Sequence, residues 1–191
     1  MDLERMNDAA RKFVTNVGLI TSNGPIGDNI MSAEWTHHIS YSPGHIMINL
    51  RSKSASTQNI LETGEFGVNI AGDTQNVVTS VAGRGSGRDY NKIAILKELG
   101  VEFYRASNIN VLMVKGAAMN VECKVIKHEV IGDHIAIVGE VVNSSAEENV
   151  QPLLFHGTRY FKLGEHIAKP DEKRMAEIDA IYDKNRKTQA T

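Results

Sequence analysis

Two long β-type runs joined by a two-residue turn constrain the fold most strongly. Between Lys115 and Ser145, apolar and β-branched residues flank Ile131-Gly-Asp-His134 on both sides. A Gly-Asp pair between two such runs indicates a tight hairpin, because glycine and aspartate tolerate the positive φ angles that these turns require. The sequence therefore predicts a long antiparallel hairpin against which the other elements must pack.

The remaining elements are short and mostly β. Further strands are expected at 13–20, 29–40, 45–50, 65–70 and 159–163, and helices from Ser54 or Ser56 to Gly64, from Asp73 to Val81, over 91–99 and over 170–186. Strands do not alternate regularly with long helices, which disfavours a doubly wound parallel sheet. We predict a mainly β (α+β) chain, with about seven strands forming a β-barrel with short helical insertions.

Length and charge limit the possible classes of protein. A chain of 191 residues is long enough for one substantial core, so we expect a single domain over 1–191 with its barrel core at 10–165. The net charge of −2 gives no global attraction to nucleic acid or to anionic membranes. With no apolar run of roughly 18 residues and no signal peptide, a cytoplasmic location is expected.

The tail and the single cysteine support further expectations. Met175, Ile178, Ile181 and Tyr182 recur at helical spacing, which predicts an amphipathic helix over 170–186. Its apolar stripe is expected to cover either this domain or a partner subunit. Cys123 has no partner for an internal disulfide, and its strand setting predicts a buried, unreactive thiol.

A candidate anion site lies where the strand at 45–50 ends and the next helix begins. The segment Arg51-Ser-Lys-Ser-Ala-Ser-Thr57 combines two cations with four hydroxyl groups. A phosphate monoester needs several convergent donors, and a helix N-terminus adds free N–H groups and a positive dipole end. A surface turn with capping serines would show the same residues, so both interpretations stay open.

A second segment suits a flat ring. Asn29-Ile-Met-Ser-Ala-Glu-Trp35 mixes small residues with amide and hydroxyl groups and ends in the only tryptophan. Small side chains let backbone amides approach the hydrogen-bonding edge of a ligand such as a flavin. Taken alone, the segment fits an ordinary strand with a core tryptophan better than a flavin site.

Taken in order along the chain, these segments resemble the flavin reductase-like family with an FMN-binding split barrel, which includes the flavoredoxins. The resemblance covers about 10–165. It is carried by 29–35, Tyr41-Ser-Pro43, 51–60, Gly64-Glu-Phe-Gly-Val-Asn69, Gly87-Arg-Asp-Tyr-Asn-Lys92 and Pro152 to Tyr160 with Gly164. It implies a Greek-key split barrel that dimerises and binds one FMN per subunit near the dimer interface.

The resemblance also assigns site residues. Asn29, Met31, Ser32 and Ala33 would border the isoalloxazine ring; Arg51, Ser52, Ser54, Ser56 and Thr57 would hold the ribityl and phosphate end; Arg88 and Lys92 would close the site. The chain has Asn91-Lys92-Ile93 and Pro43-Gly44 where the family often has Asp-Lys-Phe and Pro-Pro. These departures leave the subtype open.

Other kinds of site find less support. Gly83-Arg-Gly-Ser-Gly lacks the preceding strand and the later acid of a dinucleotide-binding fold. The seven histidines show no HxH or HExxH spacing, so no metal site is predicted. His156 is either structural or a hydrogen-bond partner of flavin or substrate.

Three functions remain open. The first is a flavin reductase-like enzyme that passes hydride or electrons from NAD(P)H through FMN to an acceptor, with no dedicated catalytic acid or base. The second is a flavoredoxin-type electron carrier that exchanges electrons with protein partners and lacks its own NAD(P)H site. The third is a cofactor-free barrel that acts as a binding or assembly domain.

Overall fold

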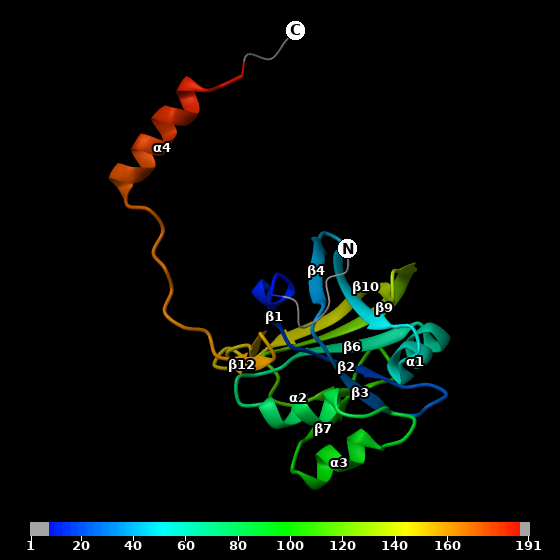
Figure 1. The fold of residues 1–191 in the computed structure, drawn as a ribbon. Helices are drawn as coiled ribbons and strands as arrows, with labels where there is room; N and C mark the ends of the chain where they lie inside the picture. Colours follow the sequence, from blue (N-terminus) through cyan, green and yellow to red (C-terminus); the bar gives the residue numbers. More distant parts are fainter. Residues whose placement is uncertain (1–7, 188–191) are drawn as a thin grey trace.

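A computed structural model describes residues 8–187, and this part of the chain is mainly β with four short α-helices (Figure 1). Seven strands form one antiparallel sheet in the order β3-β2-β6-β9-β10-β5-β4. They are β2 (Gly18–Ser22), β3 (Asn29–Ala33), β4 (Thr36–Tyr41), β5 (Gly44–Arg51), β6 (Glu65–Ile70), β9 (Met119–Ile131) and β10 (His134–Ala146). The predicted fold class is confirmed.

The predicted long hairpin is present as β9 and β10. Ile131 pairs with His134 across the turn, and Gly132 has a φ of 62° there. The hairpin lies between β5 and β6, two strands that follow one another in the sequence. Bulges interrupt its register near Val138 and Val141, and such bulges bend a strand and increase its twist.

The sheet curls around one hydrophobic core. Buried side chains from six strands belong to the same cluster, among them Ile20, Ala33, Ile48, Phe66, Cys123 and Ile137. Because β3 at one edge and β5 beside the other edge both contribute, the inner face of the sheet must wrap around these residues. Strands β3 and β4 are the two edges of the sheet and do not pair with each other in the described chain. Burial raises the pKa of the Cys123 thiol to about 12, which keeps it protonated and unreactive.

Helices cover the remaining surfaces. Helix α1 (Ala55–Thr63) starts after the N-cap Ser54 and ends at Gly64, as predicted. Helices α2 (Asn76–Gly83) and α3 (Lys92–Glu98) pack through Val78, Ala82, Ile93 and Leu96 on a second core. That core includes Leu19 and Ile30, which come from β2 and β3.

Several element boundaries differ from the sequence-based expectations. The run at 13–20 is two strands: β1 (Val14–Asn16) leaves the main sheet and pairs with β11 (Leu154–His156), while β12 (Arg159–Phe161) completes that small sheet. The run at 29–40 breaks after Ala33. The small sheet of β7 (Phe103–Arg105) and β8 (Leu112–Val114) was not predicted.

The predicted helix cap at Asp73 is wrong. Helix α2 begins at Asn76 with Gln75 as its N-cap. Asp73 instead pairs with Lys162, whose Nζ lies 2.9 Å from the carboxylate. This ion pair connects the segment before α2 to the chain just after β12.

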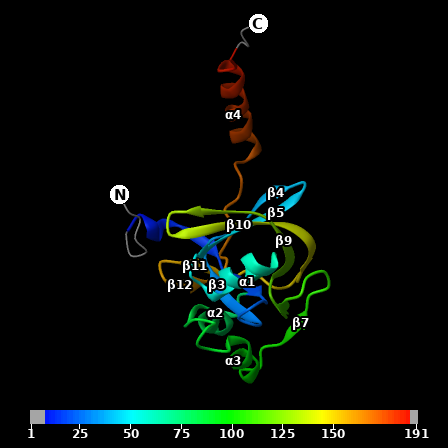
Figure 2. The same ribbon diagram turned by 90° about the vertical axis from the view of Figure 1, so that its right-hand side faces the viewer.

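The tail forms helix α4 (Glu172–Lys184), and Asp171 caps its N-terminus. Figures 1 and 2 show that it stands away from the body, after a segment without regular structure. None of its residues is buried, and Met175, Ile181 and Tyr182 are exposed. Within residues 8–187 its apolar stripe therefore does not cover this domain. No helix in that range has the length and apolar content needed to cross a membrane.

Candidate functional site

The turn between β5 and α1 is held in one conformation by its own hydroxyl groups. Thr57 is buried and donates its hydroxyl hydrogen to the carbonyl of Arg51 at 2.9 Å. The Ser54 hydroxyl accepts from the Thr57 amide at 3.1 Å and lies 2.8 Å from the Thr57 hydroxyl. Arg51 at the end of β5 and Ser52 in the turn before α1 are exposed. A ligand would therefore meet a cation and a hydroxyl group beside a helix N-terminus.

Strand β3 lies directly beside this turn. The Asn29 side chain is buried and donates from Nδ2 to the Ser56 hydroxyl at 2.8 Å. One step further along the same face, the Ser54 hydroxyl oxygen lies 3.8 Å from the Met31 sulfur. These contacts join two segments that are more than twenty residues apart in the sequence. We call the group formed by Asn29–Ala33, the 51–57 turn and Gly87 the cradle.

The far end of β3 is lined by small residues. Ala33 is buried in the main core, while Ser32 is half-buried. Ser32 faces the end of α2, where a Cβ on Gly83 would lie 3.5 Å from the Ser32 Cβ. The cradle thus has a polar, cationic end at Arg51 and a less polar end at Ala33.

The loop between α2 and α3 approaches the cradle at Gly87. A Cβ at this position would lie 2.3 Å from Oδ1 of Asn29, so only glycine fits without a shift. The next residue, Arg88, is exposed and lines a cavity of about 540 Å³. The same cavity is bordered by Gly27, Asp28, Asp89, Tyr90 and Lys97, among others.

Comparison with known proteins identifies the chain. Residues 10–164 match the flavin reductase like domain. The chain belongs to the flavin reductase-like family. A relative named "FMN reductase (NADH) RutF" from Pseudomonas syringae is 23% identical over 82% of this chain and 84% of its own length. A relative from Archaeoglobus fulgidus without an assigned function is 29% identical over 82% of this chain and 78% of its own.

Solved structures show the same fold. The flavoredoxin from Methanosarcina acetivorans superposes with a TM-score of 0.77, covering 93% of this chain and all of its own, at 19% identity. At 19% identity, this structural similarity establishes only that the two proteins share a fold. Membership of the flavin reductase-like family rests on the domain match, which spans every segment that the resemblance used.

Lys92 of this flavin reductase-like chain is buried rather than exposed at a loop edge. Its ammonium group donates to the Ala82 carbonyl at 2.9 Å, at the C-terminal end of α2. Burial lowers the pKa of Lys92 to about 8, because a charged ammonium is penalised when water is removed. Lys92 therefore titrates near neutral pH, whereas a lysine in water does not.

Trp35 does not belong to the core. It is 45% exposed, and its ring centroid lies 4.7 Å from that of His134. His134 pairs across the sheet with Arg51, which places Trp35 and His134 near the cationic end of the cradle. Nδ1 of His134 lies 2.7 Å from the Asp133 carboxylate, and this hydrogen bond lowers the pKa of Asp133.

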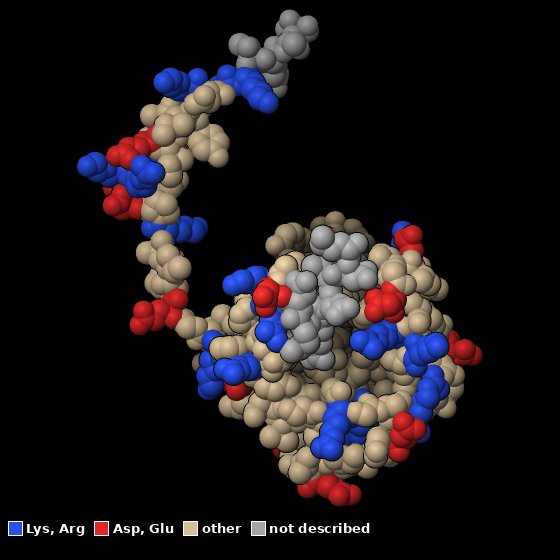
Figure 3. All heavy atoms as spheres, in the orientation of Figure 1, with Lys and Arg blue, Asp and Glu red and all other residues tan. Residues whose placement is uncertain are grey.

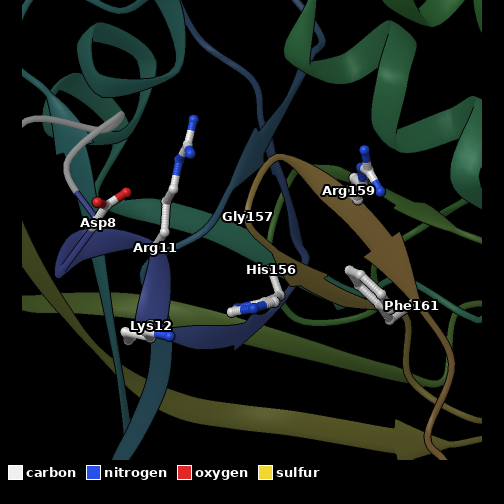
Figure 4. A pocket seen from close by; sticks show the side chains of 7 residues that line it. All are labelled: Asp8, Arg11, Lys12, His156, Gly157, Arg159 and Phe161. Atoms are coloured by element: carbon white, nitrogen blue, oxygen red, sulfur yellow. The ribbon is translucent and has the colours of Figure 1, made fainter.

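His156 shares no contact with the cradle among the described interactions and lines a separate pocket of about 550 Å³. Figure 4 shows its imidazole between Lys12 on one side and Phe161 on the other. Sequence reasoning singled out His156 but missed Arg11 and Lys12, which lie more than 140 residues away. No local signal joins these segments, because the pairing of β1 with β11 brings them together.

Other clusters add no site. Within residues 8–187, no three His, Cys, Asp or Glu side chains gather as ligands for a metal ion. On the face drawn in Figure 3, basic and acidic side chains are interspersed rather than gathered into one basic surface.

Proposed function

We propose that this chain is an FMN-binding oxidoreductase that passes hydride or electrons from NAD(P)H to an acceptor. The observation that carries the proposal is the convergence of the 51–57 turn with β3, through the bond from Asn29 to Ser56. Two segments that are weak signals in isolation thereby form one cradle with an anion-binding end and a small-residue end. The relative named as an NADH-dependent FMN reductase supports the same cofactor and donor.

The donor groups fit the phosphate end of FMN. Arg51 and Ser52 are exposed, so each can turn toward a phosphate oxygen. The Ser56 hydroxyl accepts from Asn29 and keeps its own hydrogen for a ligand oxygen. Thr57 has committed its hydrogen to the Arg51 carbonyl, so it supports the site by fixing the turn and Ser54.

The opposite end of the cradle fits the ring. Asn29, Met31, Ser32 and Ala33 would border the isoalloxazine, because their strand runs from the phosphate end into the small-residue end. Gly87 permits the later loop to touch Asn29, and Arg88 and Lys92 would close the site from that loop. Bound FMN supplies the hydride and electron chemistry, while the protein orients it and limits solvent access.

An absorption spectrum of the purified protein tests the cofactor. We expect the bands of oxidised flavin, and rapid bleaching when NADH or NADPH is added without oxygen. A coloured protein that millimolar nicotinamide does not bleach would support a flavoredoxin-type carrier instead. A protein that stays colourless after incubation with FMN would leave only a binding or assembly role.

Lys92 gives FMN binding a predicted pH dependence. The group is an ammonium below pH 8 and neutral above it, and an anionic ligand favours the charged form. We expect the dissociation constant of FMN to rise by about tenfold as pH increases through 8, since one favourable charge is lost. A Lys92→Met variant should bind more weakly at neutral pH and lose this step. Equal wild-type affinity on both sides of pH 8 would contradict a role for Lys92.

We also propose a homodimer. The apolar stripe of α4 has no cover within the described chain, and an isolated 13-residue helix is marginal in water. A partner subunit would supply that cover. Light scattering of the full chain should then give twice the 21.0 kDa mass of one chain; a single-chain mass would exclude the dimer.

A further inference from the structure

A second pocket carries a charge pattern that the cradle does not use. It is lined by Asp8, Arg11, Lys12, His156, Gly157, Arg159 and Phe161, and we call it the His156 pocket (Figure 4). Three of these residues are cations and one is an acid, so the pocket is positive whatever the charge on His156. Its volume of about 550 Å³ lies within the range that small-molecule sites show.

A tight hairpin places two of these side chains together. Gly157 and Thr158 both have positive φ, 54° and 71°, as the two-residue turn between β11 and β12 requires. His156 and Arg159 consequently face each other across the hairpin. Thr158 is β-branched, and a β-branched residue disfavours positive φ. This turn therefore costs conformational free energy.

The imidazole is oriented by the first strand. Nδ1 of His156 lies 3.2 Å from the Phe13 carbonyl, which can only accept, so Nδ1 carries a hydrogen in this contact. Nε2 is then left to accept from a ligand hydroxyl when the ring is neutral, or to donate when it is protonated. Figure 4 shows Arg11 and Arg159 extending in the same direction on either side of His156.

Strand pairing links the pocket to the Ala33 end of β3. Ala33 pairs with Gly18, and Asn16 donates to the Thr36 carbonyl at 3.1 Å. Asn16 is opposite Leu154, and two residues earlier Val14 is opposite His156. Two residues of strand span about 7 Å. The strand that pairs with Ala33 thus follows directly in the sequence after the strand that pairs with His156.

We propose that the His156 pocket binds the phosphate groups of the nicotinamide dinucleotide, an inference that rests on the proposed function. Arg159 offers a planar guanidinium group that can pair with two oxygens of one phosphate, and Lys12 adds a point charge. The cradle holds its own anion at Arg51, at the opposite end from the ring. Two separate cationic centres in one chain suit two phosphate-bearing ligands.

Binding of 2′,5′-ADP to the purified full-length protein, saturated with FMN, tests this assignment by calorimetry. We expect Arg159→Gln to weaken binding by about tenfold or more, because hydrogen bonds to charged groups contribute strongly. Lys12→Gln should weaken it less. Lys115→Gln, which removes an exposed cation paired with Glu102, should leave binding unchanged. Absence of binding of both 2′,5′-ADP and 5′-ADP to the wild type at millimolar ligand, or equal binding by Arg159→Gln, would overturn the proposal.

A comparison with 5′-ADP separates the two sources of phosphate. Of these two probes only 2′,5′-ADP carries a 2′-phosphate, and only 5′-ADP carries a pyrophosphate. Tighter binding of 2′,5′-ADP assigns the pocket to the 2′-phosphate of NADPH, and tighter binding of 5′-ADP assigns it to the pyrophosphate that both dinucleotides carry. The outcome is independent of hydride transfer. If the protein binds no flavin but Arg159 is still needed for 2′,5′-ADP, the proposed function fails and the pocket assignment stands. If NAD(P)H bleaches the flavin equally in wild type and Arg159→Gln at limiting nucleotide, only the pocket assignment fails.

Discussion

Replacement of Arg51 by glutamine is expected to weaken FMN binding by ten- to a hundredfold without disturbing the fold. Arg51 is exposed at the end of β5, so the substitution removes no core contact. Its guanidinium would pair with the phosphate, and a hydrogen bond to a charged group contributes about 1.5–3 kcal/mol, which corresponds to that range in affinity. A titration that follows flavin fluorescence measures the change directly.

Two controls make the Arg51 result specific. Lys115→Gln removes one positive charge from an exposed loop, and it should bind FMN as the wild type does. Riboflavin lacks the phosphate, so its weaker binding should not depend on Arg51. If Arg51→Gln weakened riboflavin and FMN equally, Arg51 would act on the structure of the turn rather than on the phosphate.

Trp35 offers a reporter for the same titration. It stands half-exposed beside His134, near the end of β5 that carries Arg51. The sequence placed this tryptophan either in the core or beside a flavin, and the structure excludes the core. Its position depends on the break between β3 and β4. The break consists only of Glu34 and Trp35, and neither residue type indicates the end of a strand.

The fold was predictable where its determinants are local. The β9–β10 hairpin follows from Gly132 between two apolar runs, and α1 follows from Ser54 and Gly64 at its ends. The predicted boundaries of helices and strands were wrong where tertiary contacts determine them. Asp73 has the chemistry of a helix cap but forms an ion pair with Lys162 instead, and no pattern near Asp73 indicates a lysine from the other end of the chain.

The site was predictable only in parts. The 51–57 turn is a plausible anion site by its residue types alone, but the bond from Asn29 to Ser56 depends on how β3 packs beside α1. The same is true of Lys92, whose sequence context resembles a loop cation and whose ammonium is buried against α2. The His156 pocket joins residues 8–12 to residues 156–161, so the local sequence around either segment does not predict it.

Gly87→Ala is expected to be the most damaging small substitution in the cradle. Its φ is outside the left-handed region, so alanine fits the backbone, but the added Cβ would lie 2.3 Å from Oδ1 of Asn29. Asn29 is buried, so its amide can move only by giving up the bond to Ser56. We expect the free energy of unfolding to fall by about 1–3 kcal/mol and FMN affinity to fall by about tenfold or more.

A matched glycine and a double-mutant cycle distinguish this mechanism from a general loss of stability. Gly44→Ala adds a methyl group 3.5 Å from Val141, an ordinary contact away from the cradle, and should change neither quantity. In an Asn29→Ala background the obstructing amide is absent, so Gly87→Ala should add little to the loss that Asn29→Ala causes alone. Additive effects of the two substitutions on FMN affinity would show that Gly87 acts through something other than Asn29. The close approach of the loop to β3 would then have no part in binding the cofactor.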